Sequence, residues 1–478
     1  MVVLEAIILS GSKSVIGDEV VEELNGKLRG QMVLAGDDTY DEVRTVWSAM
    51  IDRKPAIIVR CAGPSDVINL VNFARDNDLQ LAGRGGGHSF AGNAVCDGGF
   101  VIDLSPMQGV RVDPVKQTAR AEPGVIWVNC DIETQAFGLA TTGGTNSDIG
   151  IAGLTLGGGH GWLGGKYGLT VDNLLSGDIV TADGQMPTAS PTENSDLFWA
   201  VRGGGGNFGV VTSFEYQLHP VGTLLAGMLL HPFANAKEVM TEYREFMRDR
   251  PRELTSMCGL MTSPDGDPMA GIVICYNGDI EEEEKLLEPL RKFGPPIADL
   301  VSPMPYTVVQ TMIDALTPAG RQNYKKAHFL ADLSDEAIDI MIASFKGVTS
   351  PFSAVIVQHT GGEMQHGAGD AAAYSQRDAL YNQIIFSAWL DRGESEVHIK
   401  WNRDLWEAMK PHTAGGVYVN YIGREVEEGG DMMRSAYCAA YPRLVGMKNK
   451  YDPKNLFRHN QNIKPTVQGP PDSAGIRY

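Results

Sequence analysis

The sequence lacks the features that mark metal-binding, nucleic-acid-binding and membrane proteins. Its six cysteines are scattered, without CxxC pairs or the histidine spacing typical of metal sites. Positive charge is scarce, since 40 lysines and arginines stand against 59 acidic residues and leave a formal net charge of −19. That balance argues against nucleic acid or an anionic membrane as a partner. No apolar run approaches the roughly 20 residues that span a bilayer, and residues 2–9, interrupted by Glu5, lack the basic leader of a signal peptide.

From these absences we expect a cytoplasmic, metal-free protein, a monomer or a homodimer, whose partner is a small molecule. The cysteines are expected to be small buried hydrophobic residues in a reducing compartment. The acidic run 279–284 is expected to begin a helix. At 478 residues the chain exceeds one ordinary core, so two or three folding units are expected.

Glycine, by contrast, is abundant, with 56 residues, and it is clustered. The first cluster lies within residues 84–93, where three consecutive glycines precede His88. Bare backbone brings N–H groups close to a ligand's phosphates, and the histidine would place an imidazole beside that ligand. A tight turn followed by a packed histidine is the alternative, and these ten residues alone do not decide between the two.

Two further glycine clusters follow. Residues 141–165 break all periodicity, yet Ile149, Leu154 and Trp162 are interleaved with the glycines, which favours an ordered, ligand-lining connection over disorder. Gly203–Gly206 precede a predicted strand over 209–216. Both clusters contain the spacing GxGxxG, but neither has the strand before and the long helix after it that a Rossmann site requires. A P-loop is excluded because Tyr167 follows Gly165-Lys166.

The remaining pattern predicts a mixed fold. Residues 1 to about 50 are expected to be mostly helical and peripheral, and a strand–helix–strand unit over 56–82 is expected to feed the first glycine loop. His219-Pro220 is a predicted domain boundary. Beyond it, amphipathic helices alternate with apolar strands such as 354–357, which we interpret as a substrate-carrying layer. Further strands are predicted over 100–104, 117–122 and 178–182, and helices over 127–137 and 195–201.

In combination these segments resemble the berberine-bridge-enzyme-like branch of the vanillyl-alcohol-oxidase flavoprotein superfamily. The resemblance covers nearly the whole chain and is strongest over 55–220 and 415–465. The motifs that carry it are Arg84-Gly85-Gly86-Gly87-His88-Ser89, the block from Gly150 to Gly161, Lys166-Tyr167-Gly168-Leu169, the segment from Trp199 to Val211, Tyr418-Val419-Asn420-Tyr421, and the segment from Tyr451 to Phe457.

The resemblance implies an α+β fold with a two-part PCMH-type FAD-binding domain and a separate α+β substrate domain, an antiparallel sheet covered by helices. The FAD-binding domain would comprise residues 1–220, completed by 440–478, and the substrate domain residues 221–439.

The resemblance also implies that FAD is bound covalently through the 8α-methyl group by His88. Some relatives carry a second link from a cysteine at the position of Asn146, so a single link is expected here. Ile149 stands where valine is associated with oxidases and leucine with dehydrogenases, which leaves that choice open. The other implied FAD contacts are Arg84, Gly85, Gly86, Gly87, Ser89, Gly92, Gly143, Thr145, Asn146, Asp148, Ile149, Gly150, Gly153, Gly158, Gly159, His160, Gly161, Gly209, Val211, Asn460 and Asn462.

The resemblance places the segment 418–421 at the flavin, with Tyr421 as the expected catalytic base and Tyr418 next. A free tyrosine has a pKa near ~10, so a base role requires a nearby cation or hydrogen-bond donor that the sequence does not reveal. Packing of both tyrosines on a strand face is the alternative. Weaker candidates for the substrate pocket are Gln358, His359, Glu363 and Arg377.

Three functions remain open on the sequence. The expected one is an oxidase that removes a hydride from a CH–OH or CH–NH group and returns the electrons to O2 as H2O2. A dehydrogenase with another acceptor is the second, and a flavin-binding protein without turnover is the third. Nothing between residues 221 and 415 selects a substrate.

Overall fold

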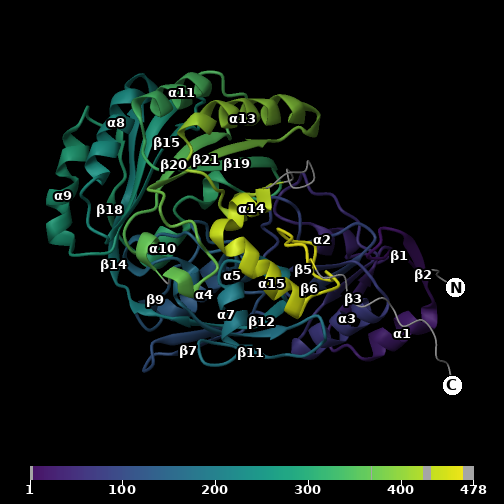
Figure 1. The fold of residues 1–478 in the computed structure, drawn as a ribbon. Coiled ribbons are helices and arrows are strands. Elements are labelled where there is room, and N and C mark those ends of the chain that lie inside the picture. Colours follow the sequence, from purple (N-terminus) through teal and green to yellow (C-terminus); the bar gives the residue numbers. More distant parts are fainter. Residues whose placement is uncertain (1–3, 368, 424–431, 467–478) are drawn as a thin grey trace.

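The computed structural model of the chain describes residues 4–367, 369–423 and 432–466. Figure 1 shows a large helix-covered sheet above a body built from two smaller sheets, with the C-terminal helices lying across the junction. The α+β class and the antiparallel sheet covered by helices are thus confirmed. Of the predicted domain segments, residues 1–3, 368, 424–431 and 467–478 lie outside the described part of the chain.

The first small sheet has four strands in the order β3-β4-β6-β5. Strands β4 and β5 both pair with β6 in parallel, while β3 is antiparallel to β4. Helix α3 (Pro64–Asp76) starts with proline in its first turn and buries Val67, Leu70, Val71 and Ala74, one face at helical spacing. The strands are β3 (Gln31–Leu34), β4 (Ile57–Arg60), β5 (Leu81–Arg84) and β6 (Phe100–Asp103).

The second small sheet has five antiparallel strands in the order β11-β10-β12-β8-β7. Its inner face packs on the helices α4 (Trp127–Gln135), α5 (Ile151–Leu156), α7 (Ser195–Val201) and α15 (Tyr441–Tyr451). A two-stranded pair, β9 (Leu139–Ala140) with β13 (His219–Pro220), lies beside it. The five strands are β7 (Val110–Asp113), β8 (Thr118–Ala121), β10 (Leu174–Val180), β11 (Thr188–Ala189) and β12 (Val210–Gln217).

The large sheet is antiparallel and runs in the order β17-β14-β16-β15-β20-β21-β19, with β18 also paired to β14. Helices α8 (Ala236–Met247), α11 (Asp335–Phe345) and α13 (Ser395–Met409) cover its outer face, as Figure 1 shows, and α9 (Ile280–Lys292) packs at one end. The strands are β14 (Thr223–Pro232), β15 (Leu254–Thr262), β16 (Pro268–Tyr276), β17 (Ala298–Asp299), β18 (Ser302–Pro305), β19 (Gln322–Leu330), β20 (Ala354–His359) and β21 (Tyr381–Trp389).

The first 50 residues contradict the prediction of a mostly helical segment. They form an antiparallel pair of strands, β1 (Leu4–Ile7) with β2 (Lys13–Ile16), then α1 (Asp18–Gly26), β3 and the one-turn helix α2 (Tyr40–Arg44). Each of these strands has four residues, which is too short for alternation to stand out from a helical pattern.

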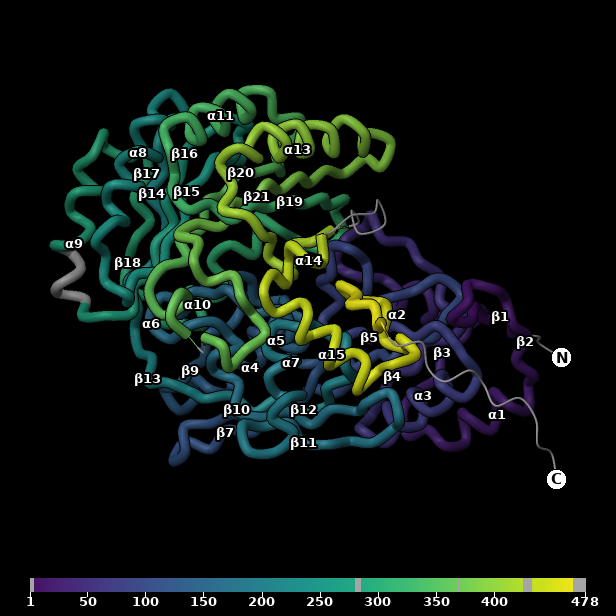
Figure 2. Tube along the Cα trace, in the orientation of Figure 1, coloured from purple at the N-terminus to yellow at the C-terminus, as the bar shows by residue number. Residues whose placement is uncertain are grey.

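The second glycine cluster is ordered, as predicted, but it contains helices that the sequence did not suggest. These are α5 and the one-turn helix α6 (Gly164–Tyr167). The other short helices are α10 (Tyr306–Thr311), α12 (Glu363–His366) and α14 (Met432–Tyr437). Figure 2 traces the chain, and the C-terminal segment returns to its first part, where His459 lies 3.1 Å from Gln80 and Arg458 donates to the Leu9 carbonyl at 2.6 Å.

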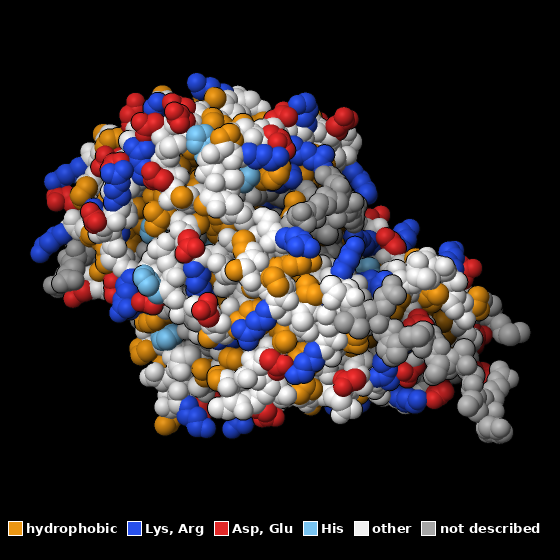
Figure 3. All heavy atoms as spheres, viewed as in Figure 1, with side chains coloured by type: hydrophobic (Ala, Val, Ile, Leu, Met, Phe, Trp, Pro, Cys, Tyr) orange, Lys and Arg blue, Asp and Glu red, His pale blue; other side chains and the backbone are white. Residues whose placement is uncertain are grey.

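The surface charges and the burial of the cysteines agree in part with the expectations from the composition. On the face in Figure 3, acidic and basic side chains are intermingled. Five of the six cysteines are buried, whereas Cys438 is exposed, so the expectation of burial is wrong for that residue. Within the ranges described above, no helix is both long enough and apolar enough to cross a bilayer.

Candidate active site

One large cavity lies between the inner face of the large sheet and the glycine loops of the smaller sheets. We call it the central cavity. Many of the predicted cofactor contacts line it, along with both predicted catalytic tyrosines. The predicted residues on its wall are Gly85, Gly86, Gly87, His88, Ser89, Thr145, Asn146, Ile149, Gly150, Gly153, His160, Gly209, Val211, Tyr418, Tyr421 and Asn460.

The first glycine loop and the second meet backbone to backbone. A Cβ atom on Gly150 would lie 2.4 Å from the Gly86 nitrogen, and one on Gly86 would lie 2.5 Å from the Gly150 Cα. Gly87 adopts a φ of +73°, which favours glycine. We call these two apposed loops the glycine cradle, since side chains are excluded where the two backbones touch.

His88 ends the first loop and points along the cavity wall. Its ring stacks on Trp47, with the ring centroids 4.6 Å apart, and its Nε2 atom lies 3.0 Å from a carboxylate oxygen of Asp148. That contact lacks hydrogen-bond geometry, so among the described residues His88 Nε2 has no hydrogen-bond partner. Asp148 itself stands outside the cavity lining. The imidazole is thus held by stacking, and His88 lines the cavity.

Other predicted contacts lie behind the wall. The Arg84 side chain hydrogen-bonds the Val43 carbonyl and faces Asp103, away from the cavity. A Cβ on Gly161 would lie 2.1 Å from the Gly143 carbonyl oxygen, so these two glycines permit close backbone packing. None of these residues lines the cavity, and the same holds for Gly92, Gly158, Gly159 and Asn462.

Tyr418 and His160 form a buried polar cluster at one end of the cavity. The Tyr418 oxygen accepts hydrogen bonds from the Gly159 N–H (2.8 Å) and from the Asn420 amide (2.9 Å). Burial raises the pKa of Tyr418 to about 12, although these donors act to lower it. The His160 ring stacks on Tyr418 at 4.4 Å. The two donors fix the position of the Tyr418 oxygen and favour its ionised form, which is what a base role requires.

His160 is neutral, because burial lowers its pKa to about 4. Its Nε2 atom lies 2.9 Å from the Tyr374 hydroxyl, and its Nδ1 atom lies 3.4 Å from Oε1 of Gln358. A tautomer with the proton on Nδ1 satisfies both contacts. Gln358 therefore supports the cluster from behind.

Tyr421 is the other candidate base, and the structure shows beside its ring a cation that the sequence did not reveal. The Lys325 Nζ atom lies 4.2 Å from the centroid of the Tyr421 ring and 4.1 Å from that of Phe90. Burial raises the pKa of Tyr421 and lowers that of Lys325 to about 7. A cation over the ring favours the tyrosinate electrostatically. Lys325 lines the cavity from β19 and is the main site residue that sequence reasoning missed.

The three remaining substrate-pocket candidates lie away from the cavity. Arg377 and Asp172 form a buried ion pair, with Nη2 2.6 Å from Oδ1. Glu363 pairs with Arg252 at the surface, 3.0 Å away. His359 packs beside Tyr381 at 5.5 Å, and burial lowers its pKa to about 4. None of these side chains lines the central cavity.

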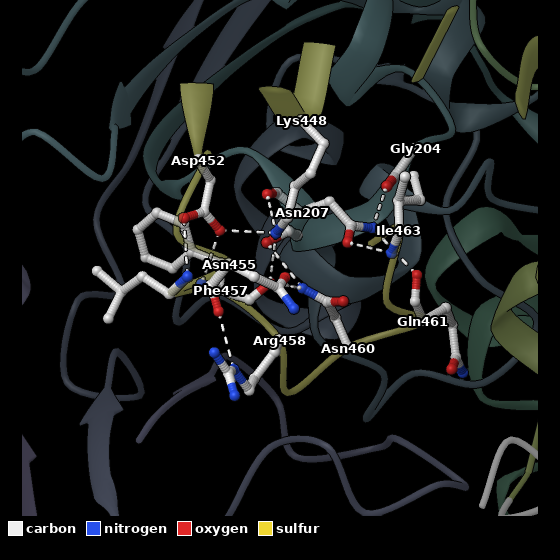
Figure 4. Close-up of polar contacts among 12 residues, drawn as sticks. Gly204, Asn207, Lys448, Asp452, Asn455, Phe457, Arg458, Asn460, Gln461 and Ile463 are labelled. Atoms are coloured by element: carbon white, nitrogen blue, oxygen red, sulfur yellow. Dashed lines mark hydrogen bonds and ion pairs between the residues drawn. The ribbon is translucent and has the colours of Figure 1, made fainter. Parts of the chain in front are cut away.

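The C-terminal segment, Lys448 to Ile463, contacts the third glycine cluster (Figure 4), and both contribute residues to the cavity wall; we call it the closing segment. The side chain of Asn207 donates to the carbonyls of Gly204 (2.8 Å) and Gln461 (3.1 Å) and accepts from the Ile463 N–H (2.9 Å). The Asn460 amide donates to the Gly206 carbonyl at 3.1 Å. Residues about 250 positions apart in sequence are thereby joined at one edge of the cavity.

A buried ion pair holds this closing segment in place. Lys448 and Asp452 are fully buried, with Nζ 2.6 Å from Oδ2. The ammonium also donates to the carbonyls of Asn207 (2.9 Å) and Phe457 (2.8 Å). The Asp452 carboxylate accepts from the N–H groups of Leu456 (2.7 Å) and Phe457 (2.9 Å). Both charges are therefore fully coordinated, and the backbone that leads into the cavity wall is fixed by them.

Comparison with known proteins identifies the family. Residues 55–190 match the family model "FAD binding domain", and residues 417–464 match "Berberine and berberine like". A FAD-linked oxidoreductase from Dictyostelium discoideum is 32% identical over 453 residues, which cover 94% of this chain and 97% of the relative. The chain belongs to the berberine-bridge-enzyme-like family of FAD-linked oxidoreductases.

Other relatives of this enzyme agree. The (R)-6-hydroxynicotine oxidase of Paenarthrobacter nicotinovorans is 29% identical, over 92% of this chain and 97% of the relative. The solved structure of 6-hydroxy-D-nicotine oxidase from Arthrobacter nicotinovorans superposes with a TM-score of 0.84 and 28% identity, over 91% of this chain and 98% of that one. A chitooligosaccharide oxidase structure shares the fold, with a TM-score of 0.83 and 24% identity over 93% and 100% of the two chains.

The cavity of this FAD-linked oxidoreductase fits the cofactor chemically. The glycine cradle offers a side-chain-free surface of the kind that accommodates phosphates. In the part of the chain that the structure describes, the side-chain oxygens of Asn460, Gln461 and Asn462 are buried without a hydrogen-bond donor, and Asn460 and Gln461 line the cavity. A flavin ring carries an N–H group and several acceptors, which suits such unpaired amides. Gln461 lines the cavity and was not predicted.

Proposed function

We propose that the enzyme is a FAD-dependent oxidase that removes a hydride from a CH–OH or CH–NH group, with Tyr421 as the base. The observation that carries the proposal is the convergence on one cavity of His88, the Tyr421 hydroxyphenyl group and the Lys325 ammonium. FAD held by the glycine cradle and His88 would supply the hydride acceptor and the route for the electron pair to O2, with H2O2 as the product.

The protein's own part is to orient the substrate and to take its proton. The hydroxyl or amine proton of the substrate is transferred to the Tyr421 oxygen as the carbon loses its hydride. The Lys325 ammonium, 4.2 Å from the ring, stabilises the tyrosinate that accepts this proton. Tyr418 is held by Gly159 and Asn420 and acts as a positioning residue beside it.

We further propose that FAD is attached to the protein through His88 alone. The histidine lines the cavity, and Asn146 stands where a second attachment would need a cysteine. The test is acid precipitation of purified protein. The wild-type pellet is expected to be yellow, and that of His88→Ala colourless. Yellow colour in the wild-type supernatant would contradict the attachment.

O2 as the acceptor is proposed from the oxidase names of the relatives that match over most of this chain. Stopped-flow mixing of the reduced enzyme with air-saturated buffer tests it. Rapid reoxidation with stoichiometric H2O2 supports the oxidase. Slow reoxidation in air, with fast reoxidation by a quinone dye, would instead indicate the dehydrogenase.

We propose the domain division at residue 220 as well. The sheets that carry the glycine loops come from residues 31–217, and the large sheet comes from residues 223–389. The segment from Lys448 to Ile463 packs on Asn207, which supports its assignment to the cofactor-binding part.

A further inference from the structure

The side of the central cavity opposite the glycine cradle has an unusually apolar wall. Directly opposed residues on neighbouring strands form it: Ile356 pairs with Ile384, and Lys325 pairs with Phe386. Met257 on β15 extends the same face. We call these five residues of the large sheet the sheet wall. Four of the five carry no hydrogen-bonding group of ordinary strength.

Aromatic rings extend the sheet wall towards His88. Trp47 and Phe90 pack edge to face, with ring centroids 5.5 Å apart, and belong to one hydrophobic cluster with Ile384 and Phe386. Among the polar groups nearby, the Nε1–H of Trp47, a cavity-lining residue, has no hydrogen-bond partner among the described residues. The Asn146 amide donates to the Thr317 hydroxyl at 2.6 Å. Gln358 and Asn382 share the inner face of the sheet but lie outside the cavity lining.

Within the sheet wall, polarity is therefore concentrated at Lys325, which lies against Tyr421. A sugar carries a hydroxyl on most of its carbons, and every hydroxyl that leaves water without a new partner is penalised. The sheet wall offers partners at its Lys325 corner and apolar surface elsewhere. A substrate with one polar group and a flat apolar body matches this distribution.

Resting on the proposed function, we propose that the substrate is an apolar aryl or allylic alcohol or a cyclic amine, rather than a sugar. Its hydroxyl or amine lies at the Tyr421–Lys325 corner, and its apolar body packs on Ile356, Ile384 and Phe386. Oxidation converts the carbinol to a carbonyl, or the amine to an imine, with loss of one hydride and one proton.

The test uses the oxidised holoenzyme and two sets of probes. The apolar probes are 1-(2-naphthyl)ethanol, cinnamyl alcohol and 1,2,3,4-tetrahydroquinoline, and the polar ones are glucose, cellobiose and xylobiose. Binding is read from the perturbation of the visible flavin spectrum, and reaction from anaerobic bleaching. The apolar set is expected to perturb the spectrum at concentrations at least ~10-fold lower than the sugars, because burial of apolar surface drives binding. Tighter binding of the sugars overturns the substrate class.

The two readouts separate this inference from the proposed function. Sugars that bleach the flavin, with inert apolar probes, overturn the inference and leave the oxidoreductase activity intact. Apolar probes that bind without bleaching under any condition support the cavity's chemistry and contradict the proposed turnover. Absence of both binding and bleaching with the apolar set overturns the inference.

A matched pair of variants locates the effect on the sheet wall. Ile384→Gln places an amide on the wall and is expected to weaken binding of the naphthyl carbinol by about 10-fold or more. Ile297→Gln makes the same change at a position that is 60% exposed and outside the cavity lining, and it is expected to leave binding unchanged. Equal effects of the two variants contradict a role for the wall.

Discussion

The two sides of the central cavity are built on different principles. The glycine cradle presents main chain, and its shape depends on residues that have no side chain at Gly86 and Gly150. The sheet wall presents side chains that alternate along strands, such as Lys325 and Ile384. A cradle of this kind serves a constant ligand, because few substitutions are tolerated within it. The wall can exchange one side chain at a time, which suits a substrate that differs among relatives.

The largest expected effect comes from filling the cradle. Gly150→Ala puts a Cβ atom 2.4 Å from the Gly86 nitrogen, so the two loops must separate. We expect near-complete loss of bound flavin, measured as flavin absorbance per protein after gel filtration. Gly36→Ala, at a glycine with open space around its Cβ position, is the control. Full flavin content in Gly150→Ala, with unchanged circular dichroism, would show that the cradle tolerates side chains after all.

On the sheet-wall side of the cavity, substitution of Tyr421 or Lys325 is expected to have the largest effect on kcat/KM. Tyr421→Phe removes the proposed base and is expected to lower kcat/KM by about 10²–10⁴-fold. Lys325→Met is expected to lower it as well, whereas Lys325→Arg keeps a cation beside the ring and retains more activity. The rates are measured by anaerobic flavin reduction across pH.

The opposite ranking of the Tyr421 and Lys325 variants would indicate a different base. An active Tyr421→Phe together with an inactive Lys325→Arg would assign the base role to the neutral amine of Lys325, whose pKa burial lowers to about 7. Tyr418→Phe serves as the comparison, because its oxygen already accepts two hydrogen bonds.

A third prediction concerns the buried ion pair Lys448–Asp452, which holds the closing segment in place. Asp452→Asn leaves the fully buried Lys448 ammonium without its partner and is expected to destabilise the fold by about 3–5 kcal/mol. Asp404→Asn breaks a pair of the same i,i+4 spacing at the surface, with Lys400, where about 0.2–1 kcal/mol is expected. Denaturant unfolding measures both. Similar losses in the two variants would mean that the buried pair is not what fixes the closing segment.

The smallest effect, on the wall, is a pH-dependent change in thermal stability. The pKa of Lys325 falls from 10.5 to about 7 on burial, so the unfolded chain binds more protons between these values and stability rises with pH. Lys325→Met removes the cost of burying the charge, which is greatest below about pH 7. We expect the variant to raise Tm by roughly 2–4 °C more at about pH 6 than at about pH 9. A larger rise at the higher pH would contradict the burial of a charged amine.

The first loop of the cradle could be singled out from the sequence because its signal is local. Three consecutive glycines and His88 occupy one short stretch, and their spacing is the same whatever surrounds them. The sheet wall could not be singled out in this way, because its residues come from four strands between Met257 and Phe386.

Lys325 and its neighbour Lys326 show the difficulty. They are adjacent in one strand, and a strand sends successive side chains to opposite faces. Lys325 faces the cavity, whereas Lys326 lies over the Trp406 ring at 4.0 Å beneath helix α13. The pairing register of β19 with β21 decides which of the two lysines faces the cavity. The sequence of β19 alone does not reveal that register.

The closing segment has a consequence for how the enzyme is made. The Ile463 N–H bonds the side chain of Asn207, which is synthesised 256 residues earlier. During translation the glycine loops are synthesised before the segment that covers them. Domains of a growing chain generally fold in the order in which they are synthesised. The cavity is complete only once residue 463 has left the ribosome. Truncation before this segment is therefore expected to leave every glycine motif in place and to remove the C-terminal part of the cavity wall.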